Sequence, residues 1–135
     1  MVEAADGMAA QVRQVAVIPP NTPLTIIDGV RRVTPRQSAH SQYRPIDLFL
    51  RSLAEDAGSR AIGVVLSGGL SDGALGVAAI KAAGGVTFVQ DPDSAKHDSM
   101  PRSAISSGAI DFVLPPAGIA RELARIGVHP YVGWE

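Results

Sequence analysis

The apolar residues of this chain follow two different periods, and the change between them lies near residue 45. Before that point the apolar runs are short and rich in β-branched residues, which predicts strands over 15–18 and 24–28. Asp28-Gly29 is typical of a tight hairpin turn, so a strand over 30–33 should pair with the preceding one. The polar segment 35–44 is expected to be an exposed loop.

After residue 45, helical and extended patterns alternate. Apolar residues at helical spacing predict helices over 45–57, 72–83, 101–107 and 116–126, and unbroken apolar runs predict strands over 61–66, 86–90 and 110–114. Such runs are typical of strands buried on both faces of a parallel sheet. The pattern therefore predicts an α/β fold with a doubly wound, mainly parallel sheet, helices on both faces and a β-hairpin near the N-terminus.

Composition supports one domain with an aliphatic core. The chain has 135 residues, of which 46% are hydrophobic and only 4% aromatic. A domain of this length can bury enough surface to fold without disulfides. We expect residues 1–14 to form an N-terminal junction or loop, residues 15–127 the domain, and residues 128–135 a C-terminal tail.

The charge balance and the absence of cysteine exclude several kinds of protein. Twelve basic and 13 acidic residues give a net charge of −1, which argues against nucleic-acid binding. Without cysteine, the chain has no disulfide, cysteine nucleophile or thiolate metal ligand. No apolar stretch approaches the ~20 residues of a membrane helix, and no secretory signal is recognised. A cytoplasmic protein without membrane insertion is expected.

Ligands of doubly wound sheets bind beyond the carboxyl ends of the strands, which directs attention to the loops 67–72 and 91–100. Gly68 and Gly73 have the spacing of a phosphate-binding loop. Ala74-Leu75 replaces the Lys-Ser/Thr pair that such a loop needs, which argues against nucleotide binding. No cofactor is expected.

Asp72 has two interpretations from the residues alone. It can cap the helix that follows, because aspartate is a favoured N-cap residue. It can also be the carboxylate that orients a catalytic histidine. The chain has no G-x-S-x-G nucleophile elbow, and its histidines lie in no recognised catalytic motif; they are His40, His97 and His129.

Two charged clusters are best interpreted as solvated surface. The second loop contains a potential metal cluster, but its ligands lack regular spacing on a fixed element; they are Asp91, Asp93, His97 and Asp98. No metal is expected. The arginines near the hairpin favour a solvated strand edge over an acidic partner site; they are Arg31, Arg32 and Arg36.

The stretch from Gly63 to Gly76, GVVLSGGLSDGALG, resembles the region around the catalytic aspartate of chemotaxis receptor methylesterases of the CheB type. Other matching pieces follow in the family's order: VIPPN at 17–21, DLFLRSLA at 47–54, AIKAAGG at 79–85, QDP at 90–92, SMPRSAI at 99–105 and DFVLP at 111–115. The resemblance covers roughly residues 3–126 and is nearest to esterase domains fused to methyltransferase or sensor-kinase modules.

The resemblance implies hydrolysis of glutamyl methyl esters on chemoreceptors by a Ser-His-Asp triad, with release of methanol, within a two-component or receptor-adaptation system. Asp72 matches the triad aspartate. The family's serine and histidine lie in the first half of its domain, which this sequence does not contain. The chain therefore looks like the C-terminal part of such a domain, and alone it is expected to be inactive.

The resemblance also suggests an oxyanion donor and substrate contacts. The family reads G-M-G-x-D-G, and here Gly69 replaces the methionine whose N–H helps to form the oxyanion hole, while Leu70 replaces the next glycine. Gly69 can still donate its N–H. Four nearby residues are candidates for substrate binding: Ser67, Gly68, Met100 and Pro101.

The sequence is also compatible with two alternative functions. One is a non-catalytic signalling module derived from the esterase domain, which Leu70 and the missing nucleophile favour. The other is a small enzyme that uses Ser67, His97 and Asp72 from within the chain. The expected partner is a methylated chemoreceptor or a similar signalling protein. We also expect a homodimer, through the sheet edge that lacks the first half of the domain.

Overall fold

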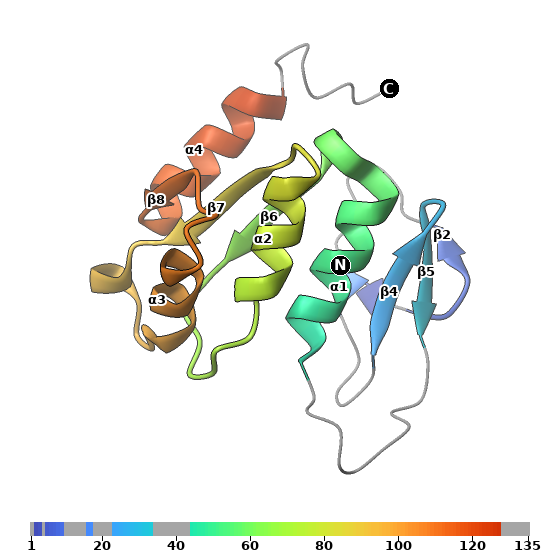
Figure 1. Ribbon diagram of the computed structural model, residues 1–135, viewed down its shortest axis with the longest axis horizontal. Helices are drawn as coiled ribbons and strands as arrows, with labels where there is room; N and C mark the ends of the chain where they lie inside the picture. Colours follow the sequence, from blue (N-terminus) through green and yellow to red (C-terminus); the bar gives the residue numbers. More distant parts are fainter. Residues whose placement is uncertain (1, 4, 10–15, 18–22, 34–43, 128–135) are drawn as a thin grey trace.

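The computed structural model describes residues 2–3, 5–9, 16–17, 23–33 and 44–127 (Figure 1). Its strands are β1 (Val2–Glu3), β2 (Met8–Ala9), β3 (Ala16–Val17), β4 (Leu24–Ile27), β5 (Val30–Val33), β6 (Ile62–Val65), β7 (Val86–Gln90) and β8 (Phe112–Leu114). Its helices are α1 (Pro45–Ala57), α2 (Ala74–Ala82), α3 (Ser99–Ser106) and α4 (Pro116–Gly127), with short 3₁₀ turns at Gly58–Arg60 and Pro92–Ser94.

The predicted hairpin is confirmed. Strands β4 and β5 pair antiparallel, with Ile27 opposite Val30. Both turn residues have positive φ, 52° at Asp28 and 73° at Gly29, as a two-residue turn that follows the strand twist requires. The turn N–H groups donate to the carboxylate of Asp56 on α1, which ties the hairpin to that helix.

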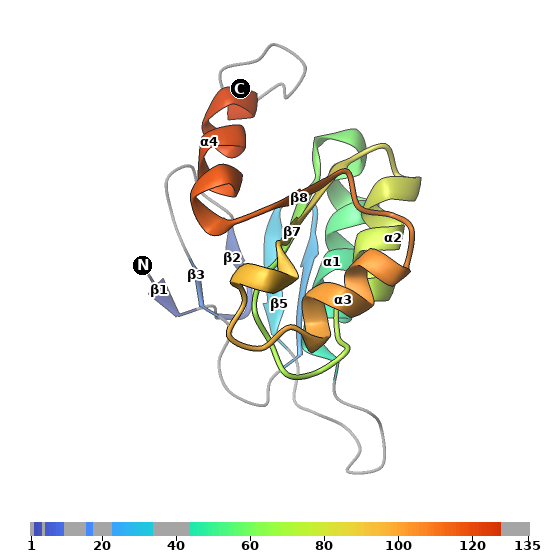
Figure 2. The ribbon, with the colours of Figure 1, turned by 90° about the vertical axis from the view of Figure 1, so that its left-hand side faces the viewer.

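The C-terminal half has the predicted parallel arrangement. Strands β6, β7 and β8 form one parallel sheet in that order. Helices α2 and α3 lie against one face and α4 against the other (Figure 2). Helix α1 packs between α2 and β4, so it joins this sheet to the hairpin (Figure 1). The predicted α/β class, with helices on both faces and an N-terminal hairpin, is confirmed.

The N-terminal segment differs from the prediction. Residues 1–14 were expected to form a junction or loop without strands, but β1 pairs with β3, and β2 adds to the hairpin through Met8 opposite Arg31. Each strand has two residues, which is too short for a period of two to appear in the sequence. Of the predicted loop 35–44, only Arg44 is described, and Val15 and Ile18 of the predicted first strand also lie outside the described residues.

The core lies where α1, α2 and α3 cover β6 and β7. Its buried residues are Leu50, Ala54, Ala61, Val65, Val77, Ile80, Val89, Met100 and Ala104. Glycine permits the closest approach between helices, because a Cβ at Gly76 would lie 2.6 Å from Leu50 Cβ. Phe88 and Phe112 stack with ring centroids 4.9 Å apart and join β7 to β8.

Asp111 connects β7, β8 and α2. Its Oδ2 accepts the Thr87 N–H at 3.0 Å, and its Oδ1 pairs with the Lys81 ammonium. Burial acts to raise the pKa of Asp111, but hydrogen bonds from Lys81 and Thr87 outweigh it, so the pKa is lowered from 3.8. The charged form is therefore favoured by folding.

A lowered pKa makes the contribution of Asp111 depend on pH. Its stabilisation is fully present above the unfolded value of 3.8 and is lost as pH falls through the lower folded value. We expect Asp111→Asn to melt below the wild type by a constant interval above about pH 5, and by a shrinking interval below about pH 4. Thermal melts across this range test it. An interval that stays constant into strong acid would contradict the assignment.

Candidate functional site

Two loops meet at the carboxyl ends of β6 and β7. The backbone N–H of Gly68 donates to His97 O at 2.9 Å, and the N–H of Met100 donates to Gly68 O at 3.0 Å. The side chain of Gln90 bridges the same loops, because its Oε1 accepts the Ser67 N–H at 2.9 Å and its Nε2 donates to Ser94 O at 3.2 Å. The loops 67–72 and 91–100, where the sequence predicts ligand binding, are therefore joined by hydrogen bonds.

Three predicted substrate-binding residues have packing roles in this arrangement. Met100 and Pro101 are buried at the start of α3. A Cβ on Gly68 would lie 2.7 Å from the terminal methyl of Met100, so the glycine allows the loop to close over that side chain. Their contact with a substrate stays a prediction.

Ser67, the fourth candidate, uses its hydroxyl on the main chain. Its Oγ accepts the His97 N–H at 2.9 Å and lies 3.2 Å from His97 O. In the described part of the chain, no hydrogen bond joins the side chains of Ser67, His97 and Asp72. The hypothesis of a small enzyme built on those three residues is therefore not supported.

The predicted oxyanion donor lies on the exposed part of the loop. Gly69 is exposed, and a Cβ there would meet nothing within 4 Å. Within the described residues, its N–H has no hydrogen-bond partner. Leu70 is 70% exposed and directs its side chain away from the core. A donor on this loop is thus accessible, and its role in catalysis stays a prediction.

Asp72 is buried, with 6% of its surface exposed, and its carboxylate faces α1. Oδ2 accepts the Ile46 N–H at 2.8 Å, and Oδ1 accepts the Asp47 N–H at 2.8 Å. The expectation that Asp72 caps its own helix is wrong. Gly73, with φ of 109°, is the residue before α2, and it lets the chain turn so that Asp72 reaches the neighbouring helix.

Asp47 makes the reciprocal contact, which no local pattern in the sequence predicts. Its Oδ1 accepts the N–H of Gly73 at 3.0 Å and the N–H of Gly76 at 2.8 Å. The backbone N–H groups at the start of α1 therefore donate to Asp72, and those at the start of α2 donate to Asp47. We call this pair of contacts, made by Asp47 and Asp72, the cross-cap.

The sequence at the start of α1 indicates that this helix needs a capping acceptor from another part of the chain. Pro45 occupies the first turn, and Arg44 at the N-cap makes no side-chain capping bond. The first N–H groups of a helix lack partners within it, so an acceptor from elsewhere was required. Asp47 adds an acidic group in the same first turn.

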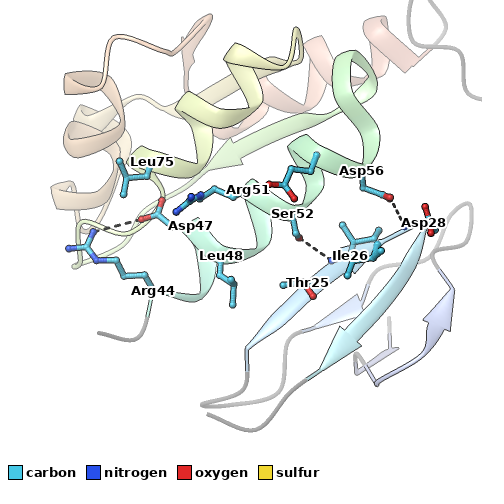
Figure 3. Close-up of a pocket in the computed structure, with 12 residues that line it drawn as sticks. Thr25, Ile26, Asp28, Arg44, Asp47, Leu48, Arg51, Ser52, Asp56 and Leu75 are labelled. Carbon is cyan, nitrogen blue, oxygen red and sulfur yellow. Dashed lines mark hydrogen bonds and ion pairs between the residues drawn. The ribbon is translucent and has the colours of Figure 1, made fainter. Parts of the chain in front are cut away.

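A groove of 690 Å³ opens between α1 and β4, beside the cross-cap (Figure 3). Arg44 and Asp47 line it near the start of α1, and Asp28 and Asp56 line its other end. Asp47 Oδ2 is buried without a hydrogen bond, and its nearest cation is Arg44 Nη1 at 3.7 Å.

The acidic residues of the second loop pair with an arginine. Arg102 donates to Asp98 at 2.8 Å, and that hydrogen bond lowers the pKa of Asp98. Asp93 lies 3.8 Å from the same guanidinium. Across the described ranges, no group of three or more histidine, aspartate or glutamate side chains could hold a metal ion. Nor does any described helix have the length and apolar character needed to cross a membrane.

Comparison with known proteins places this geometry in context. The sequence model of the family described as CheB methylesterase matches residues 1–123. An uncharacterized 104.1 kDa protein of Rhodobacter capsulatus is 47% identical over 109 residues, which cover 81% of this chain and 11% of that protein. A protein-glutamate methylesterase/protein-glutamine glutaminase of Bordetella parapertussis is 47% identical over 89 residues, 64% of this chain and 25% of that protein.

A solved structure shows the same fold over most of the chain. The crystal structure of the Thermotoga maritima CheB methylesterase catalytic domain superposes with a TM-score of 0.80 at 29% identity, covering 92% of this chain and 68% of that domain. The chain spans about a tenth and a quarter of the length of the two relatives above. The match therefore concerns one part of longer proteins.

Proposed function

Because this chain belongs to the CheB methylesterase family, we propose that it supplies the carboxylate of a Ser-His-Asp site that hydrolyses glutamyl methyl esters. One observation carries the proposal. Asp72, which matches the triad aspartate in sequence, is a buried carboxylate held on two backbone N–H groups, in the loop between β6 and α2. A carboxylate oxygen can accept more than one hydrogen bond, so Asp72 has acceptor capacity left for an imidazole N–H.

In this mechanism the catalytic residues come from two parts of the domain, this chain and the part that precedes it. A serine from that part attacks the ester carbonyl while its histidine takes the serine proton. The histidine then gives the proton to the leaving methoxide, and water repeats the sequence on the acyl-enzyme. Asp72 orients the imidazole and stabilises its protonated form, and Gly69 N–H is a donor to the oxyanion. Ser67 and Gly68 border the substrate's path over the loop.

Membership of the family supports a class of substrate. We propose a methylated chemoreceptor or similar signalling protein as the partner, acting in the cytoplasm, where receptor adaptation takes place. Relatives also carry the name protein-glutamine glutaminase. The same acyl transfer on a glutamine side chain would release ammonia instead of methanol, and we include this amide in the substrate class.

Methanol release tests the proposal directly. We compare the 135-residue chain with a longer form that adds the upstream residues of the parent protein, using methylated receptor as substrate. The 135 residues contain no nucleophile elbow, and loss of a triad serine or histidine costs about 10⁶ in turnover. We therefore expect methanol from the longer form and only background release from the chain alone. Release by the chain alone would contradict the division of groups.

An inactive longer form would favour the alternative function. The chain would then be a non-catalytic signalling module in which the Gly69-Leu70 loop is degenerate, and co-purification of a receptor would support it. Leu70 supports the non-catalytic alternative, because it places a side chain where the family has glycine. Activity in the longer form would remove this alternative.

The same two forms test a proposed homodimer. Strand β6 is at the edge of the described parallel sheet, with only β7 beside it. An unpaired edge offers N–H and C=O groups to another strand. We propose that two copies pair there in the short form and that an upstream strand takes this place in the longer one. Light scattering at about 100 µM should give a dimer and a monomer respectively. A monomeric short form would overturn this.

A further inference from the structure

We propose that Asp47 is a positioning residue that holds Asp72 in its catalytic orientation, an inference that rests on the proposed function. The two residues are linked in both directions. Asp72 accepts the N–H of Asp47, and Asp47 accepts the N–H of Gly73, the residue next to Asp72. A displacement of either carboxylate therefore moves the other.

The site loop depends on this contact at its C-terminal end. At its other end the loop is fixed through Gly68, which bonds to the second loop. Between these points Gly69, Leu70 and Ser71 are exposed. Asp47 provides the only side-chain acceptor for the Gly73 N–H in the described residues. It thus fixes the loop next to Asp72.

Loss of the Asp47 carboxylate would leave two donors without partners. The N–H groups of Gly73 and Gly76 belong to buried residues, and an unsatisfied buried donor is costly. The start of α2 would have to shift to bring them to water. Asp72 is bonded to α1, so such a shift changes the direction of its carboxylate relative to the proposed histidine.

The glycines make the contact close and directional. A side chain at Gly76 would collide with Leu50, and one at Gly73 would lie 3.3 Å from both Ile46 and Val65. The two helix starts therefore sit against each other with no room for another orientation. Such a rigid frame is what a catalytic carboxylate needs, since a misplacement of about 1 Å can cost 10²-fold in rate.

Two substitutions separate geometry from charge. Asp47→Asn removes the charge but keeps an oxygen that can accept both N–H groups. Asp47→Glu keeps the charge but moves the oxygens by one methylene. A positioning role predicts that asparagine retains kcat within roughly 3-fold and that glutamate lowers kcat by about 10²-fold, with KM nearly unchanged in both. The opposite ranking would overturn the proposal.

Asp56 provides a matched control on the same helix. Its carboxylate also accepts two backbone N–H groups, those of Asp28 and Gly29, but it does so at the hairpin turn. Asp56→Ala should also lower the melting temperature, although less than Asp47→Ala, because the N–H groups of the exposed hairpin turn can bond to water. Only Asp47→Ala should lower the kcat of the longer form, again by about 10²-fold. Equal effects of the two alanine variants on kcat would show a general loss of stability and contradict positioning.

A second readout does not depend on activity. The Ile46 N–H bonds to Asp72, so this amide in the 135-residue chain should be protected from exchange with solvent, which hydrogen–deuterium exchange followed by NMR measures. We expect this protection from exchange in the wild type and in Asp56→Ala, and its loss in Asp47→Glu. If it persists in Asp47→Glu, the positioning proposal fails. If the wild-type longer form is inactive but the protection of the Ile46 amide behaves as expected, the proposed function fails and the cross-cap stands.

Discussion

Asp72→Asn in the longer form is expected to lower kcat for ester hydrolysis by about 10⁴-fold, as loss of the triad carboxylate does in serine proteases. The charge that stabilises the imidazolium disappears, and the amide can hold the histidine in the wrong tautomer. KM should change little, because the carboxylate acts on the histidine and not on the substrate. Methanol release under saturating receptor measures the effect.

The fold should survive this change with a measurable loss. Asparagine has one acceptor oxygen where Asp72 has two, so one of the N–H groups of Ile46 and Asp47 would face an amide NH₂. An unsatisfied buried donor costs about 1–3 kcal/mol. A melting curve therefore separates the modest loss of stability from the large loss of rate.

Asp111→Asn is the control for this prediction. Asp111 is also a carboxylate that accepts a backbone N–H, but it lies between β7 and β8 and pairs with Lys81. Its replacement should lower stability and leave kcat within roughly 2-fold of the wild type. If Asp72→Asn retained kcat as well, Asp72 would be only the cap of α1, and the non-catalytic interpretation would gain.

The arrangement of elements could be predicted where local chemistry decides it. The helix from Pro45 to Ala57 begins at a proline and ends before Gly58, whose φ is 57°, and both signals are visible in the sequence. The hairpin was visible from Asp28-Gly29 because few other residue pairs adopt two positive φ values. Periodicity over several turns identified the rest of the C-terminal half.

The site was only partly predictable because its contacts are tertiary. The sequence could name Asp72 as a candidate, but its partners are N–H groups 26 and 25 residues earlier in the chain, which a local capping rule does not consider. Asp47 looked like an ordinary acidic residue in the first turn of a helix. Its contacts with the N–H groups of Gly73 and Gly76 appear only once the fold brings the start of α2 against it.

Because α1 and α2 approach closely at Gly76, we expect replacement of this glycine to lower the stability of the fold. Alanine normally improves a helix interior over glycine, by about 1 kcal/mol. At Gly76 the new Cβ would lie 2.6 Å from Leu50 Cβ and 3.3 Å from Asp47 Cα, atoms that cannot turn aside. The helices must separate, and overpacking of this kind costs about 1–3 kcal/mol beyond the gain in propensity. We expect Gly76→Ala to lower the melting temperature by roughly 4–8 °C.

Gly127→Ala is the matched substitution. Gly127 is also a helical residue, the last of α4, but a Cβ there would meet nothing within 4 Å. It should leave the melting temperature unchanged or raise it slightly. Separation of α1 from α2 also stretches the bond from the Gly76 N–H to Asp47, so Gly76→Ala in the longer form should lower kcat as well as stability. If Gly76→Ala melted at or above the wild-type temperature, α1 and α2 could accommodate an additional methyl group between them. The cross-cap could then not be the rigid frame on which Asp72 depends.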